Sequence, residues 1–362
     1  MESIAFVVGL LVISLVLRDA FETIILPRQV RRRVRVTRLV YMTSWPLFRA
    51  IARRTRNSER REALLAYFGP LSLIFLLGTW AVALIFSFAL LNWATGSQVN
   101  APDKNITFAT LLYESGTTFF TLGPGDVTPR SDGARLLMVA EAATGFGVLA
   151  IVIGYLPVLY QAFSRREVSI SMLDARAGSP PTASELLRRH CGEKHSAALE
   201  QLLYDWERWS AELLESHLSY PTIAFFRSQH DRQSWLAALT TLLDTCALVQ
   251  TGIEGASPRP ARLAFAMARH AAVDLAQVFN THPQANPPDR LPPATLALLR
   301  ESLLAAGIVL QRGPEADRRL TELRAEYEPF VDAISTFLLM PLPPWLPAEA
   351  IADDWETTGW RR

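Results

Sequence analysis

The sequence predicts an all-α membrane protein, with three transmembrane helices and a reentrant helix and loop ahead of a cytoplasmic helical bundle. Half of the 362 residues are hydrophobic, and the mean hydropathy of +0.15 lies between the values of soluble and wholly membrane-embedded proteins. Three apolar stretches precede residue 164, whereas the remainder shows helical periodicity broken by proline clusters. We therefore expect four parts, namely an N-terminal helix with a basic loop, a domain with the other two spans, a helical cytoplasmic domain and a tail, at 1–62, 63–164, 165–340 and 341–362.

The first expected span begins at Ser3. Residues 3–17 are uncharged and mostly apolar, and continuing to Leu26 gives the ~20 residues that cross a bilayer. Arg18 and Glu22 are four positions apart, so we expect them to pair on one helix face. A cleaved signal peptide would begin with basic residues and end at a small-residue cleavage site. The chain begins with Glu2 instead, which favours a retained helix.

The segment from Arg28 to Arg61 carries twelve arginines and one acid, Glu59. Such a run could bind nucleic acid. Because the segment lies between two apolar spans, its arginines are explained better by the excess of basic residues in cytoplasmic loops. Apolar residues are interleaved with the charges, which indicates an amphipathic helix in the membrane interface. We expect this segment to face the cytoplasm and to contact anionic lipid.

The second span lies within residues 63–102, which contain no charged side chain. Leu71 to Trp93 is long enough to cross a bilayer, and Trp93 suits the outer interface. Pro70 has no backbone N–H to donate, so we expect it at the start of this helix or at a kink.

The third span, Leu136 to Phe163, has 28 residues. Its length of about 42 Å exceeds the hydrocarbon core, so we expect it to tilt or protrude. Gly145, Gly147, Gly154 and Pro157 interrupt the span. Glycines permit bending or close helix approach, and proline removes a helical hydrogen bond, so these residues are candidates for a gate or hinge. A packing kink is the alternative for the proline.

Residues 113–129, YESGTTFFTLGPGDVTP, lie between these two spans and are polar and rich in glycine. We expect residues 107–120 to form a short helix capped by Asn105 or Thr107. Irregular backbone at membrane depth needs surrounding protein, and the flanking spans provide it. An ordinary Pro-Gly turn is the alternative interpretation. The core TLGPGD, at residues 121–126, resembles the selectivity-filter loop of the potassium channel superfamily, whose usual core is Thr-Val/Ile-Gly-Tyr/Phe-Gly-Asp.

The resemblance covers residues 71–163, about a quarter of the chain. It implies a tetramer with one central pore, in which backbone carbonyls from four subunits replace the water around a cation. Gly123 and Gly125 reach positive φ at low cost, as successive carbonyls pointing the same way require. The ion-binding residues would be Thr121, Leu122, Gly123, Pro124 and Gly125.

Four further residues are expected to support this filter loop. Asp126 would anchor it at the outer mouth, and Tyr113 offers a bracing aromatic ring. Glu141 is the one acidic side chain within the third span, and ionisable groups inside membranes are usually functional. We expect it to hydrogen-bond the filter region, and we expect similar support from Glu114 on the short pore helix.

The distribution of charge sets the expected topology. Residues 94–134 contain only Lys104 and Arg130 as bases, whereas arginines crowd the first loop and follow the third span. Because cytoplasmic loops are enriched in basic residues, we expect Met1 outside and the C-terminal domain in the cytoplasm. The expected location is the inner membrane, that is the plasma membrane, of a prokaryote. No span has periodic arginines, so no voltage sensor of the familiar type is expected.

Residues 164–362 show one-sided apolar stripes typical of a helical bundle, for example between Leu199 and Leu213. The stretch Trp235–Ile253 is nearly apolar enough for a fourth span, but Asp244 and several threonines favour a buried bundle helix. The two cysteines indicate no disulfide framework. The tail after Pro341 is expected to dock on a neighbour or to be disordered.

Histidines and aspartates of this region offer a weak metal hypothesis. The candidates are His217, His230, Asp231, Asp244, His270 and Asp274. The last two are four residues apart, but scattered residues of these types are more often at surfaces or helix caps. The conducted potassium ion is therefore the one metal we expect, with no cofactor. The region also lacks the strand-plus-GxGxxG pattern of nucleotide-binding gating domains.

Together these observations predict a homotetrameric cation channel that conducts potassium and is not an enzyme. The helical cytoplasmic domain would regulate gating, by a ligand that the sequence does not name. Expected partners are the other subunits and anionic lipid, not nucleic acid. Two alternatives stay open: a receptor or scaffold that keeps the pore fold without conducting, and a weakly selective cation channel. Pro124 favours both, because it stands where the superfamily has an aromatic ring that braces the filter.

Overall fold

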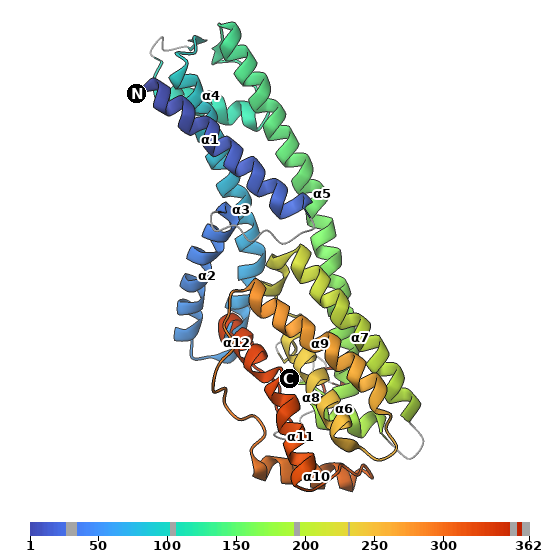
Figure 1. Ribbon diagram of the computed structural model, residues 1–362. Helices are drawn as coiled ribbons and strands as arrows, with labels where there is room; N and C mark the ends of the chain where they lie inside the picture. The colour runs from blue at the N-terminus through green and yellow to red at the C-terminus, as the bar shows by residue number, and fades with distance from the viewer. Residues whose placement is uncertain (27–34, 102–105, 192–195, 231, 348–352, 357–362) are drawn as a thin grey trace. The chain divides into compact units, whose positions relative to one another are not determined.

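The computed structural model describes residues 1–26, 35–101, 106–191, 196–230, 232–347 and 353–356, and the chain is predominantly helical (Figure 1). The all-α membrane fold that the sequence predicts is confirmed. The chain divides into two compact units. Residues 1–56 and 64–161 form the first, called the membrane unit below, and residues 57–63 and 162–362 form the second, called the C-terminal unit.

The helices, in chain order, are α1 (Glu2–Ala20) with a π-helical turn (Phe21–Ile25), α2 (Val36–Arg54), α3 (Ser58–Ala94), α4 (Phe108–Phe119), α5 (Asp132–Ala177), α6 (Ala183–His190), α7 (Ser196–Ser219), α8 (Trp235–Gly252), α9 (Pro258–Val278), α10 (Pro293–Ala305), α11 (Pro314–Ala325) and α12 (Glu328–Leu338). Short 3₁₀ helices span Pro221–Phe225 and Asp354–Glu356. The two strands β1 (Val99–Asn100) and β2 (Thr128–Pro129) pair antiparallel.

Three helices in the described part of the chain are long and apolar enough to cross a membrane, within Glu2–Ile25, Ser58–Ala94 and Asp132–Ala177. They are the three spans expected from the sequence. The expected pair of Arg18 with Glu22 forms, with the Arg18 Nε 2.9 Å from a Glu22 carboxylate oxygen. Both α3 and α5 are longer than their apolar cores, so Pro70 lies inside α3 and does not start it. Helix α5, green in Figure 1, continues without a break past Phe163 to Ala177.

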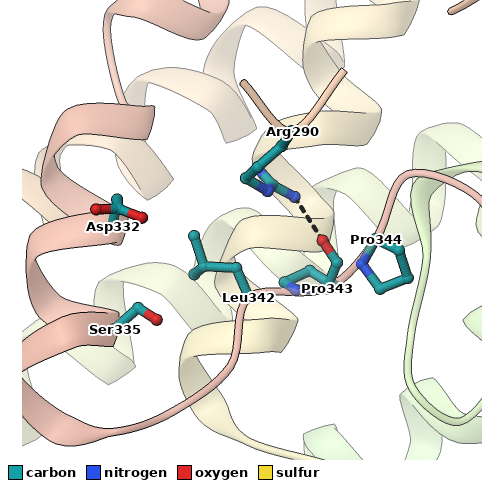
Figure 2. A pocket seen from close by; sticks show the side chains of 6 residues that line it. All are labelled: Arg290, Asp332, Ser335, Leu342, Pro343 and Pro344. Atoms are coloured by element: carbon teal, nitrogen blue, oxygen red, sulfur yellow. Dashed lines mark hydrogen bonds between the residues drawn. The ribbon is translucent and has the colours of Figure 1, made fainter. Parts of the chain in front are cut away.

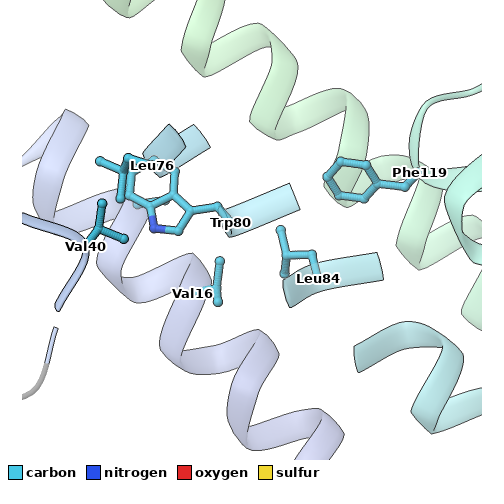
Figure 3. Packing of buried hydrophobic residues seen from close by; sticks show 7 residues of the cluster. Val16, Val40, Leu76, Trp80, Leu84 and Phe119 are labelled. Atoms are coloured by element: carbon cyan, nitrogen blue, oxygen red, sulfur yellow. The ribbon is translucent and has the colours of Figure 1, made fainter. Parts of the chain in front are cut away.

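The core of the membrane unit joins α1, α2, α3 and α4. Its buried members are Val16, Ala20, Val40, Leu76, Trp80, Leu84 and Phe119 (Figure 3). Beside it lies a buried carboxylate that the sequence analysis did not single out. Asp19 accepts hydrogen bonds from Trp80 Nε1 (3.0 Å), Thr37 N (2.9 Å) and Arg35 Nε (3.3 Å). These charge-assisted bonds connect α1 to the start of α2 and to α3.

Helix α2 is amphipathic. Its inner face surrounds the Phe68 ring with the rings of Trp45 and Phe48, at centroid distances of 4.8 and 5.1 Å. Its outer face exposes apolar side chains, namely Leu39, Met42, Leu47 and Ile51. The helix expected among the arginines is thus present. Arg28, Arg31, Arg32 and Arg33 lie outside the described residues.

Helix α8 is the centre of the C-terminal unit and packs against α9, which also packs against α7. It is buried along almost its whole length, which confirms the bundle helix expected in place of a fourth span. Asp244 on α8 is fully buried and receives both terminal guanidinium nitrogens of Arg290, at 2.5 and 3.1 Å. The Tyr327 hydroxyl also donates to it, at 2.5 Å. This metal-ligand candidate is therefore held by an arginine and a tyrosine.

The first part of the tail packs on its own unit, contrary to the expectation of a neighbour or disorder. Trp345 is buried beneath the guanidinium groups of Arg290 and Arg324, 5.6 and 5.7 Å from its ring. Arg290 also donates to the Pro343 carbonyl at 2.8 Å, beside a shallow pocket that includes Asp332 (Figure 2). The cation–π contacts, which composition does not reveal, explain the docking. Trp360 lies outside the described residues.

Candidate functional site: a pore helix and filter-like loop

Helix α4 starts at an N-cap threonine. The Thr107 hydroxyl accepts from Thr110 N at 3.3 Å, and the Thr110 hydroxyl accepts in turn from Thr107 N. This reciprocal capping satisfies two backbone donors that the first helical turn leaves free. Thr107 was one of the two caps expected from the sequence, and Asn105 lies outside the described residues.

The other end of α4 leads directly into the TLGPGD loop. Thr121 N donates to the Thr118 carbonyl (2.9 Å), and Leu122 N donates to the Thr117 carbonyl (2.8 Å). This pair of bonds is the Schellman arrangement, which needs a left-handed residue just beyond the helix. Thr121 is that residue, with φ of 54°. The loop therefore begins as the closing turn of the pore helix.

Backbone handedness alternates along the loop. φ is positive at Thr121 (54°), Gly123 (55°) and Gly125 (79°), and it is not positive at Leu122 or Pro124. Alternating handedness turns successive carbonyls toward one side, which suits a row of oxygens that replaces the water of a cation. The sequence indicated positive φ at the two glycines, whereas Thr121 was expected as an ion-binding residue without a left-handed conformation. Its signal was its position directly after a helix, where an αL cap is common.

The loop is tied down at its outer end. The Tyr113 hydroxyl of α4 lies beside the Asp126 carboxylate. Next to it, β2 pairs with β1 in the register Val99 to Pro129 and Asn100 to Thr128. The segment after the loop is thereby fixed to the segment after α3. Tyr113 thus lies at the outer end of the loop, a position that does not depend on an aromatic ring at position 124.

Glu114 on α4 and Glu141 on α5 are both buried, with exposed fractions of 2% and 0%. Glu141 on α5 contacts the Ser115 hydroxyl of α4 through its Oε1. The same hydroxyl lies 2.7 Å from the Ile85 carbonyl of α3. Ser115 is therefore the point where the three helices around the loop meet, and the sequence analysis did not name it.

The candidate gate and hinge residues of α5 differ in their surroundings. A Cβ added to Gly145 would collide with the Phe119 carbonyl oxygen and stand 2.9 Å from the Phe119 carbonyl carbon. In the described part of the chain, a Cβ added to Gly147 or Gly154 has no atom within 4 Å apart from its chain neighbours and the backbone of its own helix. Pro157 lies within the continuous helix. Gly145 thus permits close approach of α5 to the end of the pore helix, the second of the two roles that glycines suggest here.

Within the C-terminal unit, arginines hold the ends of both long helices. Arg166, on the continuation of α5, is buried and donates to the Ile223 and Phe226 carbonyls at 3.0 and 2.9 Å. Arg227 lies 3.5 Å from the Glu62 carboxylate at the start of α3 and donates to the Leu338 carbonyl. Burial lowers the pKa of Arg227 to about 10, which leaves it charged at neutral pH.

Comparison with known proteins relates part of the membrane unit to ion channels. Residues 72–161, from α3 to α5, match the ion channel family Ion_trans_2. Over 194 residues the chain is 25% identical to the uncharacterized membrane protein YdjJ of Bacillus subtilis (strain 168), which covers 52% of this chain and 55% of that protein. The chain thus matches about half the length of that relative. No solved structure matches the chain. Residues 72–161 are an ion channel domain of the potassium channel superfamily.

Proposed function

We propose that four copies of this chain assemble around one pore and conduct potassium through the backbone carbonyls of residues 121–125. The observation that carries the proposal is the alternating handedness from Thr121 to Gly125, in a loop that begins at the end of a pore helix. Carbonyls aligned in this way can replace the hydration shell of a cation. The family match supports a channel and speaks against an enzymatic role.

One chain supplies only part of a filter, so a complete filter requires several copies of the chain. One loop provides a quarter of each carbonyl ring, and cyclic symmetry is the usual way to close such a ring. The loop residues 121–126 are all exposed in the single chain, and the Leu122 side chain is 70% exposed. Large apolar side chains along α5 are exposed as well, for example Phe146 and Ile153. These surfaces suit burial against neighbouring subunits and lipid.

Pro124 is the main departure from the superfamily pattern. Proline fixes φ near −65°, which suits the one negative position between Gly123 and Gly125. It keeps a carbonyl for the ion and loses the N–H and the ring that would brace the filter. At the outer end the Tyr113 hydroxyl lies beside Asp126, where it is placed to support the loop. A potassium filter with weaker discrimination against sodium therefore stays the second candidate function.

We place the arginine-rich segment and the C-terminal unit in the cytoplasm of a prokaryote and Met1 outside, on the basis of the arginines. Helix α2 supports this orientation, since its outer face combines exposed apolar residues with Arg38 and Arg53, a pattern that suits an anionic lipid surface.

We further propose that the C-terminal unit regulates gating. It contains the start of α3 and the continuation of α5, each held by a buried arginine. A rearrangement of its helices would therefore act on both long pore helices. Glu62→Gln weakens the pair with Arg227 while the carbonyl contacts of Arg227 remain, and it should change the open probability. Glu59→Gln, at an exposed position three residues earlier, is the matched control.

The decisive experiment is cation flux into liposomes that contain the purified protein, with potassium compared with sodium. Gly123→Ala is the matched control, because the position has φ of 55° and open space for a methyl group. The expected result is a potassium flux that Gly123→Ala strongly reduces. Absence of flux in the native protein, or flux that the substitution leaves unchanged, contradicts the proposal.

A further inference from the structure

The Ser115 hydroxyl oxygen makes two contacts with other oxygen atoms. It lies 2.7 Å from the Ile85 carbonyl oxygen of α3 and in hydrogen-bond contact with Oε1 of Glu141 on α5. Ser115 and Glu141 are both 0% exposed, so water does not take part in either contact. Both contacts must therefore be explained by the hydrogen atoms that these three groups carry.

Hydrogen bonds prefer a nearly linear arrangement, and one hydrogen atom can lie on the line between only one pair of oxygens. Two linear hydrogen bonds at Ser115 therefore need two hydrogen atoms. A serine hydroxyl supplies one, and a backbone carbonyl supplies none. The second hydrogen has to come from the carboxyl group. We propose that Glu141 is a protonated carboxylic acid that donates to Ser115, while Ser115 donates to the Ile85 carbonyl. The resulting hydrogen-bond chain links α5, α4 and α3 and makes Glu141 a positioning residue for the filter.

The electrostatic surroundings support a neutral Glu141. Among the described residues, its second oxygen, like one oxygen of Glu114, is buried without a hydrogen-bond partner. Neither carboxyl group forms an ion pair within the described part of the chain. Helix α3 carries no charged side chain from Ala63 onward, and the titratable group that acts on Glu141 from α4 is another acid, Glu114. An ionised Glu141 would be a buried charge without a cation, which is costly.

The chain of hydrogen bonds matters for the filter because Ser115 lies on the helix whose last turn becomes the loop. Loss of the proton would leave one hydrogen for two contacts, so α4 would lose its tie to α3 or to α5. A Glu141→Gln side chain keeps an N–H donor in the same place and has no proton to lose. Glu141→Ala and Ser115→Ala both remove the link. Comparison of these variants distinguishes the effect of the hydrogen-bond chain from the effect of side-chain size.

Infrared difference spectroscopy of the full-length protein at neutral pH tests the protonation state directly. Subtraction of the Glu141→Gln spectrum from the native spectrum should reveal the carbonyl stretch of a protonated, buried carboxylic acid. Ser115→Ala should shift that band, because the acid loses its acceptor, and it serves as the second variant should Glu141→Gln not fold. Carboxylate bands in either difference spectrum, with no acid band, would overturn the proposal.

The positioning role rests on the proposed channel function, and liposome flux tests it. Glu141→Gln should keep the potassium flux within about threefold of the native protein, whereas Glu141→Ala and Ser115→Ala should lower it by about tenfold, as the loss of one buried hydrogen bond implies. Flux unchanged in both alanine variants would overturn the role in the filter. A native protein without any flux would refute the channel function and leave the infrared result standing.

Discussion

Asp244 in the C-terminal unit and Glu141 in the membrane unit are equally buried, yet their partners differ. Asp244 receives two nitrogens of Arg290, and other acids of that unit also meet arginines, as Glu328 meets Arg324 at 3.1 Å. Glu141 meets a serine hydroxyl, and no cation lies beside it among the described residues. The C-terminal unit thus pairs its buried charges, whereas the membrane unit keeps the carboxyl group behind the pore helix neutral.

The two units therefore hold their helices in place by different interactions. In the C-terminal unit, long arginine side chains reach carboxylates on other segments and hold the helices together. These pairs require both groups to be charged. The membrane unit uses hydrogen bonds between neutral groups and close backbone approach, as at Gly145. Asp19 is intermediate, since it lies in the membrane unit and meets Arg35, where the chain enters its arginine-rich segment.

Removal of a paired buried charge should have the largest effect. Asp244→Ala leaves Arg290 and the Tyr327 hydroxyl without their main acceptor, so we expect a loss of about 3–5 kcal/mol in the free energy of unfolding of the C-terminal unit. Denaturant unfolding of the full-length protein in detergent measures it. Asp205→Ala, at an exposed position on α7, should change stability by less than about 0.5 kcal/mol. Equal effects in both variants would refute the role of the buried pair.

Close backbone approach in the membrane unit can be tested at Gly145. Gly145→Ala places a methyl group against the Phe119 carbonyl, and overpacking of this kind costs about 1–3 kcal/mol. Gly147→Ala is the matched control two residues later, where the added methyl meets no atom and the helix gains up to about 1 kcal/mol. Thermal unfolding of the two variants should therefore shift in opposite directions. A shift in the same direction would contradict the close contact at Gly145.

The sequence predicted the helices and the loop well because their signals are local. Length, apolar composition and the spacing of Gly123 and Gly125 each depend on a short segment. The left-handed conformation of Thr121 was missed because a β-branched residue rarely adopts it, although Thr121 directly follows the expected helix, where left-handed caps are common. Asp19 and Ser115 were missed because their partners lie on other helices, and no spacing rule places such residues together.

A neutral histidine in the C-terminal unit should make that unit sensitive to acid. Burial, with Arg166 nearby, lowers the pKa of His217 to about 3, and its Nδ1 donates to the Leu213 carbonyl at 2.8 Å. Histidine in the unfolded chain titrates near 6.5. Below that pH the unfolded state binds more protons than the folded state, so stability decreases as the pH is lowered. We expect a loss of about 1 kcal/mol between pH 7.5 and 5.5. His217→Gln should remove this component, and an unchanged pH profile in the variant would exclude His217 as its source.

The smallest effect is expected where a charge pair is exposed. Arg318 on α11 contacts Glu315 at 2.6 Å, a distance as short as that of the buried pairs, but the two side chains are 66% and 81% exposed. Water solvates both ions before and after separation, so the pair should contribute less than about 0.5 kcal/mol. Arg318→Ala should therefore leave the denaturation midpoint nearly unchanged, in contrast to Asp244→Ala. A loss near that of Asp244→Ala would mean that contact distance, and not burial, decides what these pairs contribute, and the contrast between the two units would lose its basis.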